Sequence, residues 1–283
     1  MHLDVSPPLL VFGGPYSNLR ALTALRERAN DLAIPPTHTI CTGDVVAYCA
    51  EPEETTEAVR RWGCHVIAGN CEEQLAASAD DCACGFDEGT ECAALAKGWY
   101  AFANARVSQQ SRRWMAALPA TLTFSLGGLR FRVVHGGVAV VNRFLFASQR
   151  EALREELDSS GADVVIGGHA GIPFLAQIGE RVWFNPGVIG MPANDGTTDV
   201  WYGLIRIAGD ALEFSTHRLS YDHVSAAAAM CRCGHADGYA RTLTTGLWPS
   251  LDVLPPPERA AAGQRSAPQS LYVAIRKTRA AAE

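Results

Sequence analysis

The chain has 283 residues, a formal net charge of -6 and 48% hydrophobic residues. This length is sufficient to bury the core of one large α/β domain, and the charge gives no strong signal for nucleic acid or an anionic membrane as a partner. No apolar run approaches the roughly 20 residues that a membrane-spanning helix needs, and residues 1–8 lack the basic start of a signal peptide. We therefore expect a cytoplasmic protein, and its oligomeric state stays open.

The first third of the chain alternates short apolar runs with amphipathic segments. Buried strands are predicted over 7–12, 39–41 and 65–68, because each apolar run stops at a loop that contains glycine. Helices are predicted over 18–32, where leucines recur at helical spacing, and over 53–62, where acidic residues occupy the first turn. This alternation indicates an α/β sheet with polar residues presented at the strand ends.

The middle of the chain is richer in strand patterns. Tight glycine turns separate short apolar segments there, as in β-hairpins, and residues 79–90 follow no regular pattern. Further helices are predicted over 91–105, 109–117 and 222–231, and further strands over 121–125, 129–135, 163–167, 175–178, 181–185, 202–207 and 212–218.

The last part of the chain differs in composition. Three consecutive prolines begin at Pro255, and an alanine run and several basic residues follow them. Proline lacks a backbone N–H and breaks regular elements, and such a segment has little to bury. We therefore predict one domain over residues 1–254 and a mostly disordered tail over 255–283.

Four loops that follow predicted strands each combine a glycine with a polar residue. Asp44 and Asn70 come directly after glycines, His135 directly precedes one, and His169 follows Gly168. Glycine lets the backbone turn sharply and lets a ligand approach closely. Oxygen and imidazole ligands suit manganese, iron or zinc better than magnesium alone. Each dipeptide alone is an ordinary turn signal, so the prediction of a metal site depends on the order of all four along the chain.

In this order the loops resemble the calcineurin-like metallophosphoesterase family, whose pattern includes Gly-Asp, Gly-Asn-His-Asp/Glu, a turn histidine and Gly-His-x-His. The resemblance spans about residues 9–218. Further matches point to the small bacterial phosphodiesterase branch: Ser17-Asn18-Leu19, Leu118-Pro119, Ile172-Pro173-Phe174 and Asn185-Pro186-Gly187. The resemblance implies a four-layer α-β-β-α sandwich of two mixed sheets with a metal site at the strand ends.

The resemblance also implies a function. One metal position would receive Asp44, Asn70, His135 and His169, which would hold one divalent or trivalent Mn, Fe or Zn ion. A metal-bound hydroxide would then hydrolyse a phosphomonoester or a phosphodiester. The implied substrate is small and phosphorylated, for example a nucleotide or a nucleotide-like diester.

The family's second metal position is largely missing. It would need an aspartate and a histidine from the first motif and a histidine after the last loop, but Gly14, Tyr16 and Gly171 occupy these positions. The enzyme would therefore be a mononuclear hydrolase or would use substitute ligands. One alternative is a non-catalytic metal- or phosphate-binding descendant that acts as a regulatory or scaffold protein. Another is a redox or metal sensor built on the cysteines.

Several nearby residues could complete the site. Gly14, Asn18 and Cys71 could contact the substrate phosphate, Cys71 because it stands where many family members have a histidine. Tyr16 and Cys41 could serve as substitute metal ligands, although a phenol with an ordinary pKa of about 10 is a poor ligand. Packing in the core is the more common fate of both residue types.

The chain contains nine cysteines. Without an export signal, we expect free thiols or metal ligands rather than a disulfide framework. Cys82, Cys84 and Cys92 could form a small zinc site with Cys71, but their spacing matches no standard zinc motif. We prefer a mobile cap loop over the metal site as the interpretation of this segment.

Overall fold

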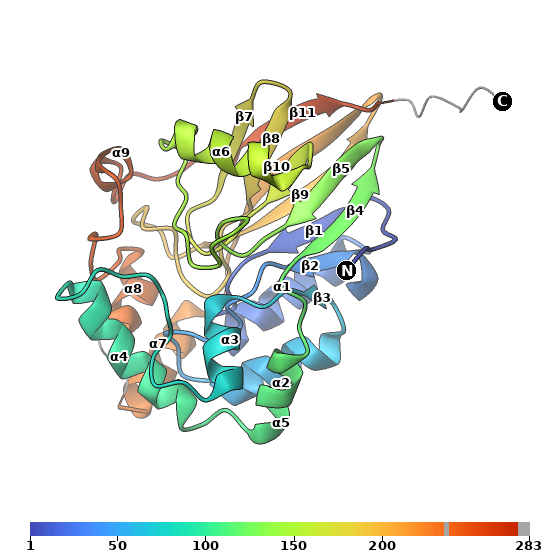
Figure 1. Ribbon diagram of the computed structural model, residues 1–283. Coiled ribbons are helices and arrows are strands. Elements are labelled where there is room, and N and C mark those ends of the chain that lie inside the picture. Colours follow the sequence, from blue (N-terminus) through green and yellow to red (C-terminus); the bar gives the residue numbers. More distant parts are fainter. Residues whose placement is uncertain (235–237, 277–283) are drawn as a thin grey trace.

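Two mixed sheets face each other in the computed structural model, which describes residues 1–234 and 238–276 (Figure 1). In spatial order, the larger sheet contains β11 (Ser270–Ala274), β10 (Ala211–Leu219), β9 (Val200–Ala208), β1 (Leu9–Phe12), β2 (Thr39–Cys41) and β3 (His65–Val66). The smaller sheet contains β4 (Leu122–Leu126), β5 (Leu129–Val133), β6 (Val164–Ile166), β8 (Arg181–Asn185) and β7 (Phe174–Ile178).

The side chains of β1 explain how the layers are held together. Successive side chains of a strand point to opposite faces of its sheet. Leu9 and Val11 therefore pack between the two sheets, in a cluster that includes Phe131 of the smaller sheet. Leu10 and Phe12 face the other way, into a second cluster beneath the helices. Because β1 is apolar on both faces, it is buried along its whole length.

Helices cover the outer face of each sheet (Figure 1). The larger sheet is covered by α1 (Leu19–Asp31), α2 (Pro52–Trp62), α3 (Asn70–Ala77), α4 (Glu91–Asn104), α5 (Gln109–Ala116), α7 (His223–Arg232) and α8 (Tyr239–Thr245). The smaller sheet is covered by α6 (Arg150–Ser160). The predicted four-layer α-β-β-α sandwich is therefore confirmed.

Three of these helices, α3, α6 and α8, were not predicted from the sequence. Helix α3 begins at Asn70, within a stretch that we interpreted only as a loop. Helix α6 packs Leu153 and Leu157 against β6, β7 and β8. The spacing of these two leucines by four residues is the helical signal that could have revealed α6. None of the helices in the described part of the chain is long and apolar enough to cross a membrane.

The predicted disordered tail is wrong for the part of it that the structure describes. Helix α9 (Pro256–Ala260) begins within the proline run, and β11 pairs antiparallel with β10 as an edge strand of the larger sheet. Apolar residues at alternating positions of β11, Leu271 and Val273, pack against the core between the sheets. The same domain therefore includes residues 255–276, and residues 277–283 lie outside the described part.

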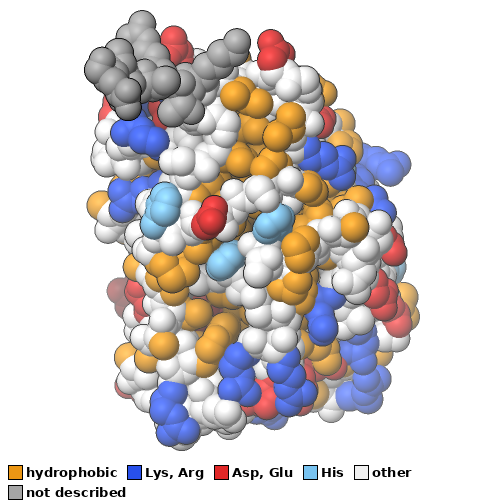
Figure 2. All heavy atoms as spheres, turned by 90° about the vertical axis from the view of Figure 1, so that its right-hand side faces the viewer, with side chains coloured by type: hydrophobic (Ala, Val, Ile, Leu, Met, Phe, Trp, Pro, Cys, Tyr) orange, Lys and Arg blue, Asp and Glu red, His pale blue; other side chains and the backbone are white. Residues whose placement is uncertain are grey.

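The face of the molecule in Figure 2 carries side chains of both charges. Lys and Arg side chains gather toward its lower part and right edge, with Asp and Glu side chains among them, and hydrophobic groups lie between (Figure 2). This mixture agrees with the small net charge of -6 and gives the face no uniform field for a polyanion or a polycation.

Candidate metal centre

The four predicted ligands meet at the carboxyl ends of parallel strands. Asp44 follows β2 and Asn70 follows β3, and these strands are parallel to β1. His135 follows β5 and His169 follows β6, which are parallel to each other in the other sheet. Carboxyl ends of parallel strands share one edge of a sheet, so each sheet contributes two of the four side chains to this point.

The Nε2 atom of His135 lies at the middle of this group. It is 3.2 Å from Oδ2 of Asp44, 3.1 Å from Oδ1 of Asn70 and 3.0 Å from Nδ1 of His169. One possible ligand atom from each of Asp44, His135 and His169 lies within 4.8 Å of the others. Ligand atoms about 2.0–2.2 Å from one tetrahedral cation would be roughly 3.4 Å apart. The spacing therefore fits a single cation.

The hydrogen bonds of His135 also fit a ligand. Its Nδ1 atom is 2.7 Å from the backbone oxygen of Thr42, so Nδ1 carries the proton and donates it. The lone pair of Nε2 is then directed toward Asp44 and Asn70, a tautomer that metal-binding histidines commonly adopt. His169 presents its Nδ1 atom to the same point, 3.0 Å from Nε2 of His135 and 3.7 Å from Oδ2 of Asp44. Potential ligand atoms that converge in this way are the pattern that a cation would satisfy.

Burial and charge shift the pKa values of this group. Burial alone would raise the pKa of Asp44, but the two histidines outweigh it and lower this pKa well below its usual range. Burial would lower the pKa of His135, and the Asp44 carboxylate outweighs it and raises that pKa. Burial lowers the pKa of His169, although a hydrogen bond to Asp44 partly opposes the effect. Asp44 is therefore the anion of the group, and His169 favours its neutral form.

The backbone is held in uncommon conformations at the same point. Asp44 has a φ of 55° and His169 a φ of 59°, in the left-handed region that favours glycine. Such strain in residues other than glycine concentrates at functional sites. A Cβ atom on Gly69 would lie 2.4 Å from Oδ1 of Asp44, so glycine at position 69 permits the close approach of the two loops.

Glu72 fixes these loops, and our sequence analysis gave it no role. Its buried carboxylate accepts hydrogen bonds from the backbone N–H groups of Asp44 at 2.8 Å, Val45 at 2.8 Å and Gly69 at 2.9 Å. Burial and the nearby charge of Asp44 raise the pKa of Glu72 to about 7. The signal that could have revealed this role is an acidic residue three positions after Gly69, as in a helix capping box.

Comparison with known proteins places the chain in a family. A family model described as the calcineurin-like phosphoesterase superfamily domain matches residues 17–210, which is more than half of the chain. The chain belongs to the calcineurin-like phosphoesterase superfamily. The resemblance of the loop motifs to this superfamily is therefore confirmed.

Solved structures with the same fold agree with this assignment. One is a metallophosphoesterase from Sphaerobacter thermophilus, with 19% identity, a TM-score of 0.67, and coverage of 86% of this chain and 100% of that one. Another is a hypothetical protein from Pyrococcus horikoshii OT3, with 18% identity, a TM-score of 0.72, and coverage of 87% and 99%. At these identities the likeness concerns the fold alone. No curated protein matches the chain significantly.

Aromatic rings surround Gly14, Tyr16 and Gly171, the three positions where our sequence analysis expected missing metal ligands. A Cβ atom on Gly14 would lie 2.3 Å from the ring of Tyr16, and one on Gly171 would lie 3.2 Å from the ring of Trp248. The ring of Tyr16 packs edge-on against Tyr48 at a centroid distance of 4.8 Å. Burial, with the charge of Asp44, raises the pKa of the Tyr16 phenol well above its usual value. Apolar packing thus takes the place of ionic ligands here.

The other predicted site residues have defined places in the fold. Cys41 is buried in β2, and burial raises the pKa of its thiol. Asn18 is buried and caps α1, because its Oδ1 accepts from Ala21 N at 3.2 Å while its Nδ2 donates to Gly190 O at 3.1 Å. The backbone N–H of Cys71 donates to Oδ1 of Asp44 at 3.4 Å. The phosphate and substitute-ligand roles of these residues stay predictions.

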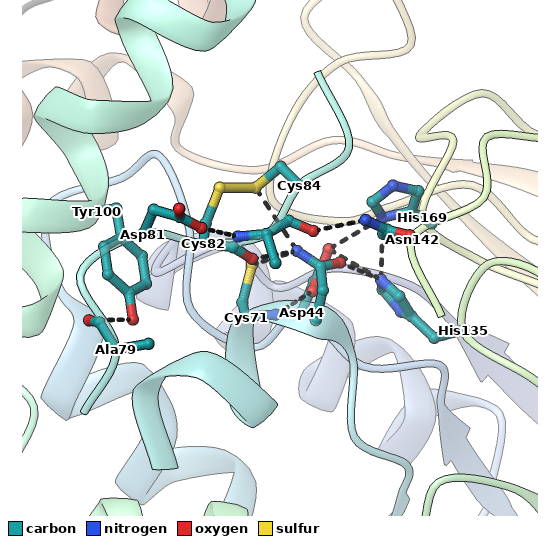
Figure 3. Close-up of a disulfide and its surroundings, with 12 residues drawn as sticks. Asp44, Cys71, Ala79, Asp81, Cys82, Cys84, Tyr100, His135, Asn142 and His169 are labelled. Carbon is teal, nitrogen blue, oxygen red and sulfur yellow. Dashed lines mark hydrogen bonds and ion pairs between the residues drawn. A yellow bond between two sulfur atoms is a disulfide. The ribbon is translucent and has the colours of Figure 1, made fainter. Parts of the chain in front are cut away.

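The structure corrects our expectation of free thiols or metal ligands for two of the nine cysteines, and the other seven are free. Cys82 and Cys84 form a disulfide, which lies beside Asp44, His135 and His169 (Figure 3). Cys92 belongs to α4, where it lines a cavity with Trp248 and Ser250. The zinc site considered for these cysteines would require two thiolates that the disulfide removes.

Proposed function

We propose that the protein is a phosphoesterase that uses one metal ion, held by Asp44, Asn70, His135 and His169. The main support for this proposal is that three potential ligand atoms lie within 4.8 Å of one another. A Mn, Fe or Zn ion bound there would polarise a phosphoryl oxygen and lower the pKa of bound water. Membership of a superfamily of phosphoesterases supports the reaction class.

Asp44, Thr42 and Glu72 would each have a separate role in this metal centre. Asp44 supplies the negative charge, because the histidines hold its pKa low. Thr42 orients the ring of His135, and Glu72 holds the Asp44 loop through backbone hydrogen bonds. These contacts preorganise the ligands, so little reorganisation is needed when the cation binds.

A small cavity next to His169 supports a substrate with a compact apolar or aromatic ester group. The cavity has a volume of about 60 Å³, room for roughly four water molecules by the same measure. Its walls include six aromatic side chains: Tyr16, Tyr48, Phe86, Phe144, Tyr239 and Trp248. The ring of Phe144 lies 4.2 Å from the ring of His169, so an ester group in the cavity would be close to a phosphate at the metal centre. A nucleotide-like diester or an aryl ester has this form.

Hydrolysis of an aryl phosphodiester tests the proposal. We expect metal-free protein to gain activity toward bis(4-nitrophenyl) phosphate when Mn²⁺ or Zn²⁺ is added, and about one metal ion to bind per chain. Even partners that only orient a ligand are worth about 10–100-fold in metal affinity or activity. His169→Ala should therefore lower both by about 100-fold or more. His65→Ala, which alters a half-buried histidine at the start of β3, is the control. Unchanged activity in His169→Ala would refute the assignment.

One observation favours the second candidate, a non-catalytic metal-binding descendant that works through a partner. The positions of three lost ligands, Gly14, Tyr16 and Gly171, are now enclosed by aromatic rings. Two-metal hydrolysis uses both ions to stabilise the attacking and leaving oxygens. Binding of one metal ion without turnover of mono- and diesters would favour this second candidate over the first.

A further inference from the structure

Sulfur atoms surround the candidate ligand Asn70 on the side that faces away from His135. The Nδ2 atom of Asn70 lies 3.5 Å from Sγ of Cys84 and 3.6 Å from Sγ of Cys71, and it donates a hydrogen bond to the backbone oxygen of Cys82 at 2.9 Å. Figure 3 shows the Cys82–Cys84 disulfide on this side and the two histidines on the other. The disulfide loop is therefore a direct neighbour of the metal centre.

These contacts determine how the Asn70 amide is oriented. An amide has an oxygen that accepts and a nitrogen that donates, and its surroundings decide which end points where. The oxygen of Cys82 holds Nδ2, so Oδ1 points to His135 at 3.1 Å, as a metal ligand requires. If the loop moved, the amide could rotate and present its nitrogen, which cannot bind a cation. The position of the 82–84 loop thus controls one metal ligand.

The disulfide contributes little to stability through loop closure. Its cysteines are separated by only two positions in the sequence. The entropy that a cross-link removes from the unfolded chain grows with the length of the loop that it closes, so a loop this short gains least. The conformation of residues 82–84 is therefore the main property that the bond sets.

A cavity gives small molecules access to the disulfide. Cys82 and Cys84 are largely buried, but both line a cavity of about 600 Å³ that also contacts Asp81, Lys97 and Asn142. This volume is in the range of typical small-molecule binding pockets, so a tripeptide thiol is small enough to enter the cavity. Lys97 could pair with a carboxylate of such a thiol, and Asp81 with its ammonium group.

We propose that Cys82 and Cys84 form a thiol–disulfide exchange site for a small thiol, and that the redox state of this site sets the metal affinity through Asn70. The inference rests on the proposed metal centre. A small thiolate attacks one sulfur, a mixed disulfide forms, and the other cysteine leaves as a thiolate that takes up a proton. A second small thiol displaces the protein sulfur. Two electrons pass to the protein, two cysteine thiols result, and the small thiol is released as its disulfide.

Cys71 is a neighbour of the exchange site and not its attacking group. Its side chain is buried, and it is not among the residues that line the cavity next to Cys82 and Cys84. The incoming thiol from the cavity therefore starts the exchange. Reduced Cys82 and Cys84 no longer constrain the loop, and the hydrogen bond from Asn70 to Cys82 weakens.

Mn²⁺ titration of oxidised and reduced protein, followed by electron paramagnetic resonance, tests the inference. We expect reduction with glutathione to weaken Mn²⁺ binding by about tenfold, because loss of a partner that orients a ligand costs about 10–100-fold. Reoxidation should restore the affinity. The double variant Cys82→Ser/Cys84→Ser should bind weakly in both conditions. Cys231→Ser/Cys233→Ser alters an exposed pair with the same spacing and should behave like the unaltered protein. Equal affinities in the two redox states would overturn the inference.

Two further measurements separate this inference from the metal proposal. The denatured oxidised protein should show seven free thiols, and the reduced protein all nine cysteines as thiols. Nine thiols under oxidising conditions would overturn the inference. The side-chain amide signals of Asn70 in a ¹⁵N spectrum should shift on reduction without any metal. If no metal bound in either state but these signals shifted, the metal centre would fail and the control of Asn70 would stand. Unshifted signals would refute that control.

Discussion

The metal centre and the neighbouring aromatic pocket occupy the same edge of the sandwich but differ in chemistry. Around His135, three potential ligand atoms lie 3.0–3.2 Å from one ring nitrogen, and further hydrogen bonds hold the Asp44 and Asn70 side chains. Around Tyr16, the side chains contact one another through rings, and the phenol is kept neutral by burial. In the first region a bound cation would satisfy the converging polar atoms, as we propose, whereas the second region buries its apolar surface through packing.

The difference shows that the aromatic pocket has its own packing and is more than a metal position with its ligands removed. Deleted ligands alone would leave space, but here Tyr16 fills the space next to Gly14 and Trp248 lies against Gly171. Protein interiors tolerate few voids, so the rings stabilise the arrangement that excludes a second ion. The proposed metal centre would therefore hold a single cation at this edge.

The largest effect should come from removing the anion of the metal centre, compared with removing a neutral hydroxyl from the aromatic pocket. Asp44→Asn removes the anion of the ligand set and should lower metal affinity and phosphodiester hydrolysis by about 1,000-fold, since several kcal/mol of charge stabilisation is lost. Tyr16→Phe removes only a neutral hydroxyl and should change metal affinity less than about threefold. Metal titration and steady-state kinetics of both variants measure the contrast. A similar loss of metal in Tyr16→Phe would make the phenol a substitute ligand.

Restoring a superfamily ligand should destabilise the protein. Gly14→Asp places a Cβ atom 2.3 Å from the ring of Tyr16 at a φ of 21°, and overpacking with backbone strain costs about 2–4 kcal/mol. Urea unfolding of Gly14→Asp measures this loss. In the double variant Gly14→Asp/Tyr16→His the smaller ring should recover at least about 1 kcal/mol, because neighbouring changes are not additive. Purely additive losses would show that the two residues do not compete for space.

The convergence of the candidate ligands was predictable, because each of them lies in a glycine-containing turn at a strand end. Gly43-Asp44 and Gly168-His169 stand directly after apolar runs, and strand ends of an α/β sheet bring such residues together. The role of Glu72 was less visible, because a carboxylate that accepts three backbone N–H groups differs in no local way from a solvated helix residue. Its burial depends on loops from two strands that meet only in the folded chain.

The regions that the sequence did not predict depend on long-range contacts. Strand β11 pairs with β10, more than fifty residues earlier, and its composition alone resembles a solvated end. Trp248 covers Gly171 from a segment after α8, and no local pattern connects these two residues. The Cys82–Cys84 disulfide was missed for another reason, because one residue separates the two cysteines and we interpreted them as free thiols or metal ligands.

The smallest effect should come from opening the aromatic pocket without touching the metal centre. Trp248→Ala removes a wall of the cavity beside His169, and an aromatic contact is worth about 1 kcal/mol beyond its buried area. We expect kcat/KM for an aryl phosphodiester to fall about tenfold relative to a methyl aryl diester, with metal affinity unchanged. Tyr272→Ala, on the exposed edge strand β11, is the matched aromatic control. If both esters lost activity equally, the pocket would support the metal centre and would not select the ester group.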